Sequence, residues 1–225
     1  MIKQWKTLIL MICLILLCLL LTACSSGKIT PSETEAGAVF YTVKCPDEIV
    51  AYAIENYSRI TLSTFRINNL RFESREISLG YPFTAYEKDE EPAVYIFPVY
   101  CNGKIIMTLH AGFLDPAIYP EEASPQVGTV GGTGLLDRID TLQKIFDTAD
   151  ADHPVFFYMD SHENFMARIG DEKILYWPAI LPDLSKPTYE DVEIPEEALI
   201  RIGLDARLDT AYLEDAPVYI DDRRP

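Results

Sequence analysis

Positive charge is scarce in this sequence of 225 residues, which has 19 lysine and arginine residues against 35 aspartate and glutamate residues. The only basic cluster is Arg223-Arg224. Nucleic acids and anionic lipid headgroups are held by clustered lysine and arginine, so the composition argues against a nucleic-acid partner. An acidic surface favours solubility, and it also suits cationic peptides or divalent ions.

Several motifs that carry chemistry are also missing. The sequence contains no Cys-x-x-Cys pair, its glycine-rich stretch lacks the Gly-Lys-Ser/Thr ending of a P-loop, and the Gly-x-Ser-x-Gly element of many serine hydrolases is absent. We therefore expect no metal and no cofactor, and we favour a protein that is not an enzyme.

Only one long apolar run is present. It extends over the 14 residues from Leu8 to Leu21 and follows two positive charges, Lys3 and Lys6. This length fits the hydrophobic region of an export signal but is short of the roughly 20 residues that span a bilayer. The beginning of the chain is therefore predicted to be a signal peptide.

The run ends at Leu21-Thr22-Ala23-Cys24, which resembles the lipobox of bacterial lipoproteins. The resemblance covers the signal alone. It implies cleavage before Cys24, a diacylglyceryl group on its sulfur, and a lipid-anchored location at the cell membrane or outer membrane, facing outside the cytoplasm. Two acyl chains hold a protein on a membrane far better than one. An ordinary secretory signal and a short transmembrane anchor remain the alternatives.

Cleavage at this point divides the chain into four predicted parts. Residues 1–23 are the signal peptide, 24–37 a lipidated polar tether, 38–177 the folded domain, and 178–225 an extended, proline-rich and acidic C-terminal appendage. Outside the signal and the lipidated cysteine, only Cys45 and Cys101 remain. They permit a disulfide in an exported protein, and two free buried thiols are the alternative.

Apolar spacing predicts an α+β fold with an antiparallel sheet and two amphipathic helices. The first helix opens at Pro46-Asp47-Glu48, where proline and two acids suit a helix start. Its apolar face comprises Ile49, Val50, Ala53, Ile54 and Tyr57. The second helix starts near Thr133, a suitable N-cap, and ends before Asp150.

Strands are predicted where apolar residues recur at every second position. Between residues 60 and 86 such pairs are Phe65 and Ile67, Leu70 and Phe72, and Ile77 and Leu79. Asn102-Gly103 favours a hairpin turn within 93–111, with Pro98 at an edge or bulge. Further strands are expected at 155–159, 165–169 and 173–177.

A ligand site is predicted in the glycine-rich stretch ahead of the second helix, at Gly131, Gly132, Thr133 and Gly134. Backbone N–H groups at a helix start can hold a phosphate or a carboxylate. The alternative is a flexible loop with a helix cap. Weaker hypotheses are a calcium site at Asp147, Asp150 and Asp152, and an acid–base role for His162 in a predicted turn.

Aromatic residues crowd the strands before and within the hairpin, and most are expected in the core: Tyr81, Phe83, Tyr86, Tyr95, Phe97 and Tyr100. Those left exposed would form a strip for a peptide or glycan. The leading hypothesis is a non-enzymatic binding or accessory module of the cell envelope, with an envelope protein, peptide or glycan as partner. A surface-attached hydrolase using His162 and a small solute-binding lipoprotein are the alternatives.

Overall fold

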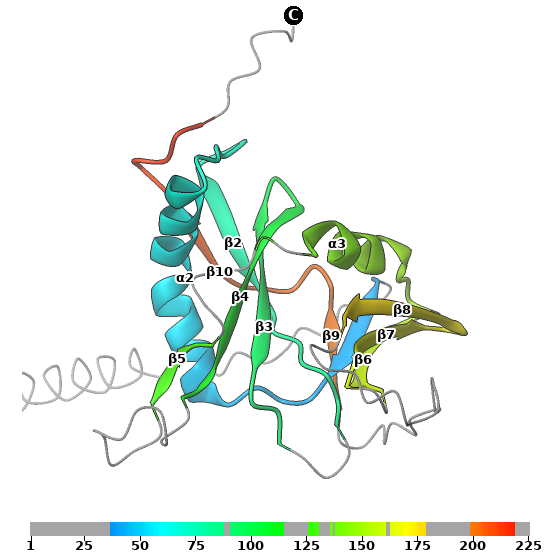
Figure 1. The fold of residues 1–225 in the computed structure, drawn as a ribbon. Coiled ribbons are helices and arrows are strands. Elements are labelled where there is room, and N and C mark those ends of the chain that lie inside the picture. The colour runs from blue at the N-terminus through cyan, green and yellow to red at the C-terminus, as the bar shows by residue number, and fades with distance from the viewer. Residues whose placement is uncertain are drawn as a thin grey trace, which may run out of the picture. The chain divides into compact units, whose positions relative to one another are not determined.

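The computed structural model describes residues 37–87, 91–114, 126–130, 136, 138–160, 163–178 and 199–218. These residues form two helices and ten strands arranged in two five-stranded sheets (Figure 1). The predicted α+β class is confirmed, although the strands build two sheets instead of one. None of the helices in these ranges is long and apolar enough to cross a membrane.

The first sheet is antiparallel throughout and has the order β10-β2-β3-β4-β5. Its strands are β2 (Glu76–Gly80), β3 (Tyr95–Cys101), β4 (Lys104–Phe113), β5 (Val127–Thr129) and β10 (Arg207–Tyr212). The second sheet has the order β8-β7-β6-β1-β9, in which β1 and β6 are parallel and the other neighbours antiparallel. Its strands are β1 (Val39–Thr42), β6 (Val155–Met159), β7 (Phe165–Ile169), β8 (Glu172–Trp177) and β9 (Ile200–Gly203).

The predicted hairpin is confirmed as β3 and β4. Asn102 and Gly103 have φ of 50° and 76°, the positive values that a two-residue hairpin turn requires. Pro98 lies in an inner strand and not at an edge, but the β3–β4 register shifts between Val99 and Tyr100, directly beside it. The expected bulge is therefore present next to the proline.

Helix α2 (Asp47–Ile67) begins as predicted, after Pro46 and with Asp47 and Glu48 in its first turn. It is longer than predicted, because the sequence from Ile60 to Ile67 continues the helix where strands were expected. The predicted strand at Phe65 and Ile67 is wrong. Residues 60, 61, 64 and 65 are buried at helical spacing, so packing on the sheet overrides the strand preference of the β-branched Ile60, Thr61 and Thr64.

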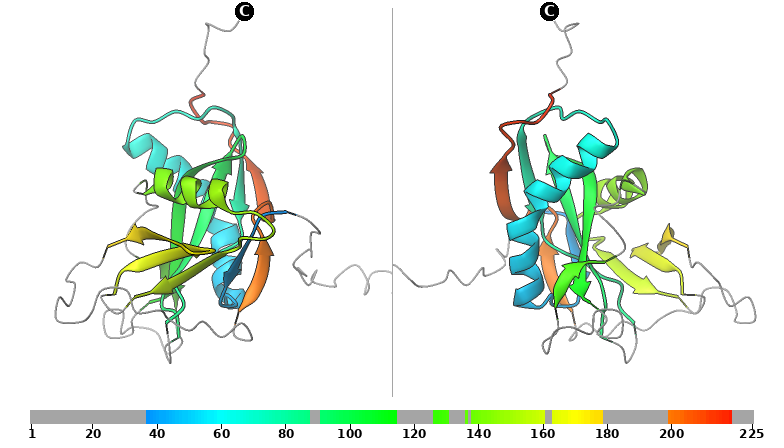
Figure 2. Two further views of the ribbon diagram at one scale, coloured as in Figure 1. Left: turned by 90° about the vertical axis from the view of Figure 1, so that its right-hand side faces the viewer. Right: turned by 60° about the vertical axis from the view of Figure 1, so that its left-hand side comes forward.

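Helix α3 (Ile139–Thr148) ends before Asp150 as predicted but begins at Ile139, so the predicted start near Thr133 is wrong. The residue before it, Arg138, has a left-handed backbone with φ of 63°. A left-handed residue cannot continue a helix toward the N-terminus, which explains the late start. Helices α2 and α3 lie on opposite faces of the first sheet (Figure 2).

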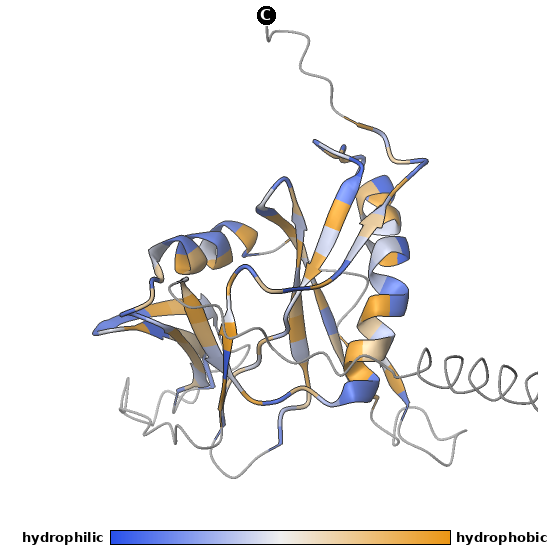
Figure 3. Cartoon of the chain, turned by 180° about the vertical axis from the view of Figure 1, so that it is seen from behind, coloured by the Kyte–Doolittle hydropathy of each residue, from blue (hydrophilic) through white to orange (hydrophobic). Residues whose placement is uncertain are grey.

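Alternation along the strands directs side chains into two cores, and apolar and polar bands alternate along the elements in Figure 3. The first core lies between α2 and the first sheet and includes Ile49, Phe97 and Leu109. The second core joins the other face of this sheet to α3 and to the second sheet.

The segment between β2 and β3 crosses from one sheet to the other. Phe83 exchanges two backbone hydrogen bonds with Ile96 of β3, at 2.9 and 2.8 Å. Three residues later, Tyr86 forms a parallel bridge with Tyr158 of β6. The side chain of Phe83 packs in the second core, where its ring stacks on Phe157 with 4.3 Å between centroids. This short crossover therefore holds the two sheets together.

The segment predicted to be a C-terminal appendage is part of the fold wherever it is described. Strand β9 pairs with β1, and β10 pairs with β2. Ile202, Leu213 and Ala216 are buried in the cores. The predicted boundary at residue 177 is therefore wrong for residues 199–218, because these strands complete edges that β1 and β2 would otherwise leave open.

Two isoleucines of β9 test this integration. Ile202 is 1% exposed, whereas Ile200 is only partly buried. We expect Ile202→Ala to lower the free energy of unfolding by about 2–4 kcal/mol and Ile200→Ala by less than about 1 kcal/mol, because only the first leaves a cavity. Urea unfolding measures both. Equal, small effects would mean that β9 does not contribute to the core.

Candidate functional site

A small polar cluster interrupts the second core where β4 meets β8. It comprises Thr108 and His110 of β4 and Tyr176 of β8. Met107 and Leu109 pack in the first core, so the residues that alternate with them turn to the opposite face. The cluster thus arises because β4 carries apolar residues on one face and two polar side chains on the other.

His110 accepts or donates one hydrogen bond in this cluster, between its Nε2 and the Oγ1 of Thr108 at 3.2 Å. Its ring also lies edge-on to Trp177, with 6.3 Å between centroids. Burial lowers the pKa of His110 to about 4, so the imidazole is neutral at pH 7. A neutral ring has one donor and one acceptor nitrogen, which lets it bond to a hydroxyl.

The Tyr176 hydroxyl is buried beside this pair. It lies close enough to Thr108 for a hydrogen-bonding interaction that lowers its pKa, although the geometry of a full hydrogen bond is not met. Burial raises the pKa of Tyr176, and Thr108 and the positive charge of Arg138 oppose this effect. Tyr176 is 0% exposed, so its hydroxyl lies inside the second core, where a polar group is costly unless it is paired.

The Thr108–His110 pair has the residue types of a nucleophile and its base, but the arrangement does not fit that chemistry. Thr108 is fully buried, and among the described residues no carboxylate contacts the second ring nitrogen of His110. A catalytic base is normally oriented by such a third group. What the cluster offers is a set of neutral hydrogen-bonding groups within an aromatic core.

The predicted ligand residues Gly131, Gly132, Thr133 and Gly134 lie outside the described residues. The residue before them does reach the cluster, because the backbone N–H of Val130 donates to the carbonyl oxygen of His110 at 3.0 Å. The glycine-rich stretch therefore starts beside the polar cluster and is followed by Arg138. These features could not be connected from the sequence alone, because nothing in it indicates that β4 and β8 lie side by side.

His162 also lies outside the described residues. The structure does describe Asp160, Glu163 and Asn164 of the same predicted turn. Asp160 is buried, and its carboxylate accepts hydrogen bonds from the backbone and side chain of Asn164 at 2.9–3.2 Å. These bonds are what a tight turn between β6 and β7 requires. The described part of the turn thus uses its acid for structure.

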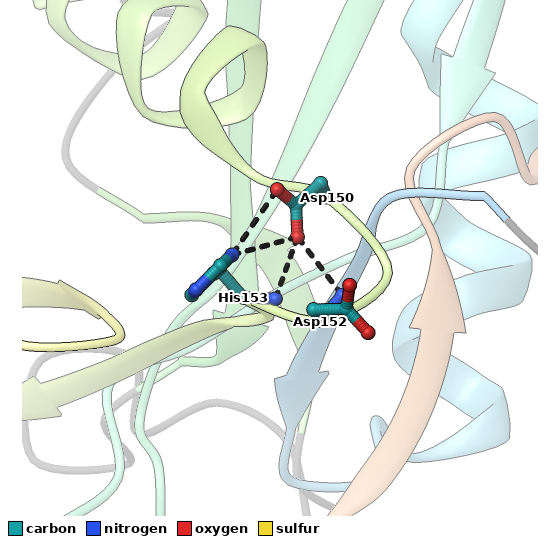
Figure 4. A network of polar contacts seen from close by, with 3 residues as sticks. All are labelled: Asp150, Asp152 and His153. Atoms are coloured by element: carbon teal, nitrogen blue, oxygen red, sulfur yellow. Dashed lines mark hydrogen bonds and ion pairs between the residues drawn. The ribbon is translucent and has the colours of Figure 1, made fainter.

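Two of the residues proposed to bind calcium, Asp150 and Asp152, instead take part in the hydrogen bonds of a turn (Figure 4). Asp150 accepts hydrogen bonds from the backbone N–H groups of Asp152 and His153 at 2.9 and 2.7 Å, and it pairs with the His153 ring at 3.0 Å. Both side chains of the pair are largely exposed. Within the described residues, no group of three or more His, Cys, Asp or Glu side chains is placed to hold a metal ion.

Cys45 and Cys101 are buried free thiols, and burial raises the pKa of both. The hydroxyl of Tyr95 donates to the carbonyl oxygen of Lys44, which places Cys45 near the first residue of β3. Cys101 is the last residue of that strand, roughly 20 Å away at 3.3 Å per residue. A disulfide needs Cα atoms within about 7 Å, so the predicted bridge is not formed.

The predicted aromatic strip is not exposed either. Phe83, Tyr95, Phe97 and Tyr100 are buried, and Tyr81 and Tyr86 are partly buried. The prediction that most of these rings belong to the core is confirmed, and a continuous strip for a peptide or glycan is excluded. The comparisons with known proteins add nothing to this picture, because no family model and no curated protein matches the chain.

An NMR titration of the imidazole C–H signals tests the electrostatics, and the sequence has only three histidines to resolve. We expect His110 to titrate near pH 4 and His153 above its ordinary pKa of 6.5, because the Asp150 carboxylate holds the proton on His153. Asp150→Asn should return the pKa of His153 toward 6.5 and leave that of His110 unchanged. Titration of His110 and His153 together near 6.5 would contradict both assignments.

The low pKa of His110 also predicts a loss of stability in acid. Between pH 6.5 and 4 the unfolded chain binds a proton that the folded chain does not, so stability falls as the pH falls. The loss for His110 is on the order of 3 kcal/mol at pH 4. In His110→Gln, the drop in unfolding free energy between pH 7 and pH 4 should be smaller by this amount. An unchanged drop would show that His110 is not buried in its neutral form.

Proposed function

We propose that this protein is a bacterial lipoprotein, anchored outside the cytoplasm through lipid on Cys24, whose folded unit acts as a non-enzymatic binding or accessory module of the cell envelope. The observation that carries the anchor is the order of features in the sequence. Two lysines, an apolar run of 14 residues and Leu21-Thr22-Ala23-Cys24 follow one another directly. The proposed partner is an envelope protein, peptide or glycan.

Two features of the fold favour binding over catalysis. Thr108 is fully buried and His110 is partly buried beside Trp177, and the Asp150–His153 pair is used to close an exposed turn. Neither pair has the exposed nucleophile and oriented base that hydrolysis needs. A hydrolase built on His162 has no supporting observation among the described residues.

A solute-binding protein that closes two lobes on its ligand is also disfavoured. Such closure needs a hinge between units with separate cores. Here the two sheets share the second core, and the crossover at Phe83 and Tyr86 bonds to both sheets.

Cys24→Ala tests the anchor, with Cys18→Ala as a matched control in the same apolar run. In cells fed an alkyne-tagged palmitate, we expect the wild type and Cys18→Ala to be labelled and Cys24→Ala to be unlabelled. Intact-mass measurement should show that labelled chains have lost residues 1–23. Unlabelled wild type, or labelling that survives Cys24→Ala, would refute the lipid anchor.

A further inference from the structure

One end of the folded unit carries most of the exposed apolar side chains. The large hydrophobic residues that are exposed in the described structure are Ile67, Leu70, Phe113, Leu175 and Tyr212. Ile67 is the last residue of α2, Leu70 follows three residues later, and Tyr212 ends β10 (Figure 1). The segments that follow α2 and β10 meet, because the N–H of Phe72 donates to the carbonyl oxygen of Pro217 at 2.9 Å and that of Leu213 to the carbonyl oxygen of Arg75 at 2.8 Å.

We call this the α2 end and define it as residues 66–76, 101–104 and 212–218. The β3–β4 turn belongs to it, because the thiol of Cys101 donates to the carbonyl oxygen of Ser74 at 3.5 Å. Ile67 is 73% exposed, Tyr212 64% and Leu70 39%. This end of the unit thus exposes two aliphatic side chains at the end of α2 and a tyrosine at the end of β10, and such residue types occur at membrane–water interfaces, where a tyrosine ring lies at the headgroup level.

The turn that presents the two aliphatic side chains is fixed. The backbone N–H of Leu70 donates to the carbonyl oxygen of Phe65 at 2.8 Å, and that of Asn69 to Arg66 at 3.2 Å. With Asn69 in the left-handed conformation, at φ of 54°, these bonds form a Schellman cap. The cap holds Ile67 and Leu70 outward, so their exposure is a property of the fold.

The α2 end differs from the rest of the chain in its balance of charges. Its sequence contains four basic residues, Arg66, Arg71, Arg75 and Lys104, and four acidic ones, Glu73, Glu76, Glu214 and Asp215. The chain as a whole has 19 basic and 35 acidic residues. The opposite end of α2, about 30 Å away along 21 residues, begins with Asp47 and Glu48. An anionic membrane surface repels acidic faces, so it repels the balanced α2 end less than the acidic start of α2.

We propose that the α2 end rests on the lipid surface to which the protein is anchored, with Ile67, Leu70 and Tyr212 inserted at the headgroup level. This inference depends on the lipid anchor proposed above. The 14-residue tether reaches up to about 45 Å when extended, more than the length of α2. Tethering makes the contact intramolecular, with an effective concentration in the millimolar range, so a weak apolar contact suffices.

The test uses the full-length lipidated protein in phosphatidylcholine vesicles that contain phosphatidylglycerol and a spin-labelled lipid. A fluorophore is placed on Glu73→Cys at the α2 end or on Asp171→Cys in the exposed turn between β7 and β8; each change removes one carboxylate. Cys45 and Cys101 are buried, so neither competes for the label. We expect quenching by the spin-labelled lipid to be at least twofold stronger at residue 73 than at residue 171.

Two further variants assign the contact to the apolar side chains. Ile67→Ser combined with Leu70→Ser should reduce quenching at residue 73 to the level at residue 171, whereas Leu175→Ser should leave it unchanged. Leu175 is the matched control, because it is 39% exposed like Leu70 but lies on β8. Equal quenching at both label positions, or no effect of the serine pair, would overturn the proposal.

Vesicle flotation separates this proposal from the lipid anchor. A protein that does not float with vesicles contradicts the anchor itself. One that floats but shows no preferential quenching at residue 73 keeps the anchor and overturns only the orientation. A signal that depends on protein density and not on spin-labelled lipid would place a second copy of the chain on the α2 end, and would overturn the proposal as well.

Discussion

The packing of Phe83 is the contact on which the arrangement of the two sheets depends. Its backbone is bonded to β3 of the first sheet, while its ring stacks on Phe157 of β6 and lies edge-on to Phe146 of α3 and to Tyr176 of β8. One side chain thus contacts three elements that the chain reaches only about 60 to 95 residues later. Aromatic contacts of this kind contribute beyond the area they bury, which suits a residue that joins two sheets.

The position of the polar cluster follows from this contact. Because Phe83 draws β8 and α3 against the open face of the first sheet, Tyr176 comes to lie beside Thr108 and His110, and Arg138 lies close enough to influence its pKa. The same contact makes the folded unit one body. With the lipid anchor proposed above, such a body can have a preferred face toward the membrane, and the α2 end is the face that we propose.

Much of the local structure was predictable because it depends on neighbouring residues. Asn102-Gly103 sets its own turn, and Pro46-Asp47-Glu48 sets a helix start. The failures involve distant parts of the chain. Strands β9 and β10 are short and lie after a proline-rich stretch, and only their pairing with β1 and β2 reveals them. Phe65 and Ile67 are two apart in sequence, as in a strand, but Phe65 is buried in the core between α2 and the first sheet, and this packing favours the helix.

The candidate site was the least predictable part. Thr108 and His110 are two residues apart on an evident strand, which is a signal that two polar groups share one face. Their partner Tyr176 lies 66 residues beyond His110, and no local pattern connects them. The glycine-rich stretch was singled out for its composition, and its neighbour Val130 does bond to His110. Predicting such a spatial arrangement would require knowing how the strands pair in both sheets.

The claim that the two sheets form one body is tested most directly by following urea unfolding with two probes on one sample. Trp177, the only tryptophan outside the first 23 residues, reports on the second sheet, and the far-ultraviolet circular dichroism of the 21-residue α2 reports on the first. Coincident transitions are predicted, because the shared core cannot be lost from one sheet alone. Two separate midpoints, with one sheet folded while the other is unfolded, would contradict the account.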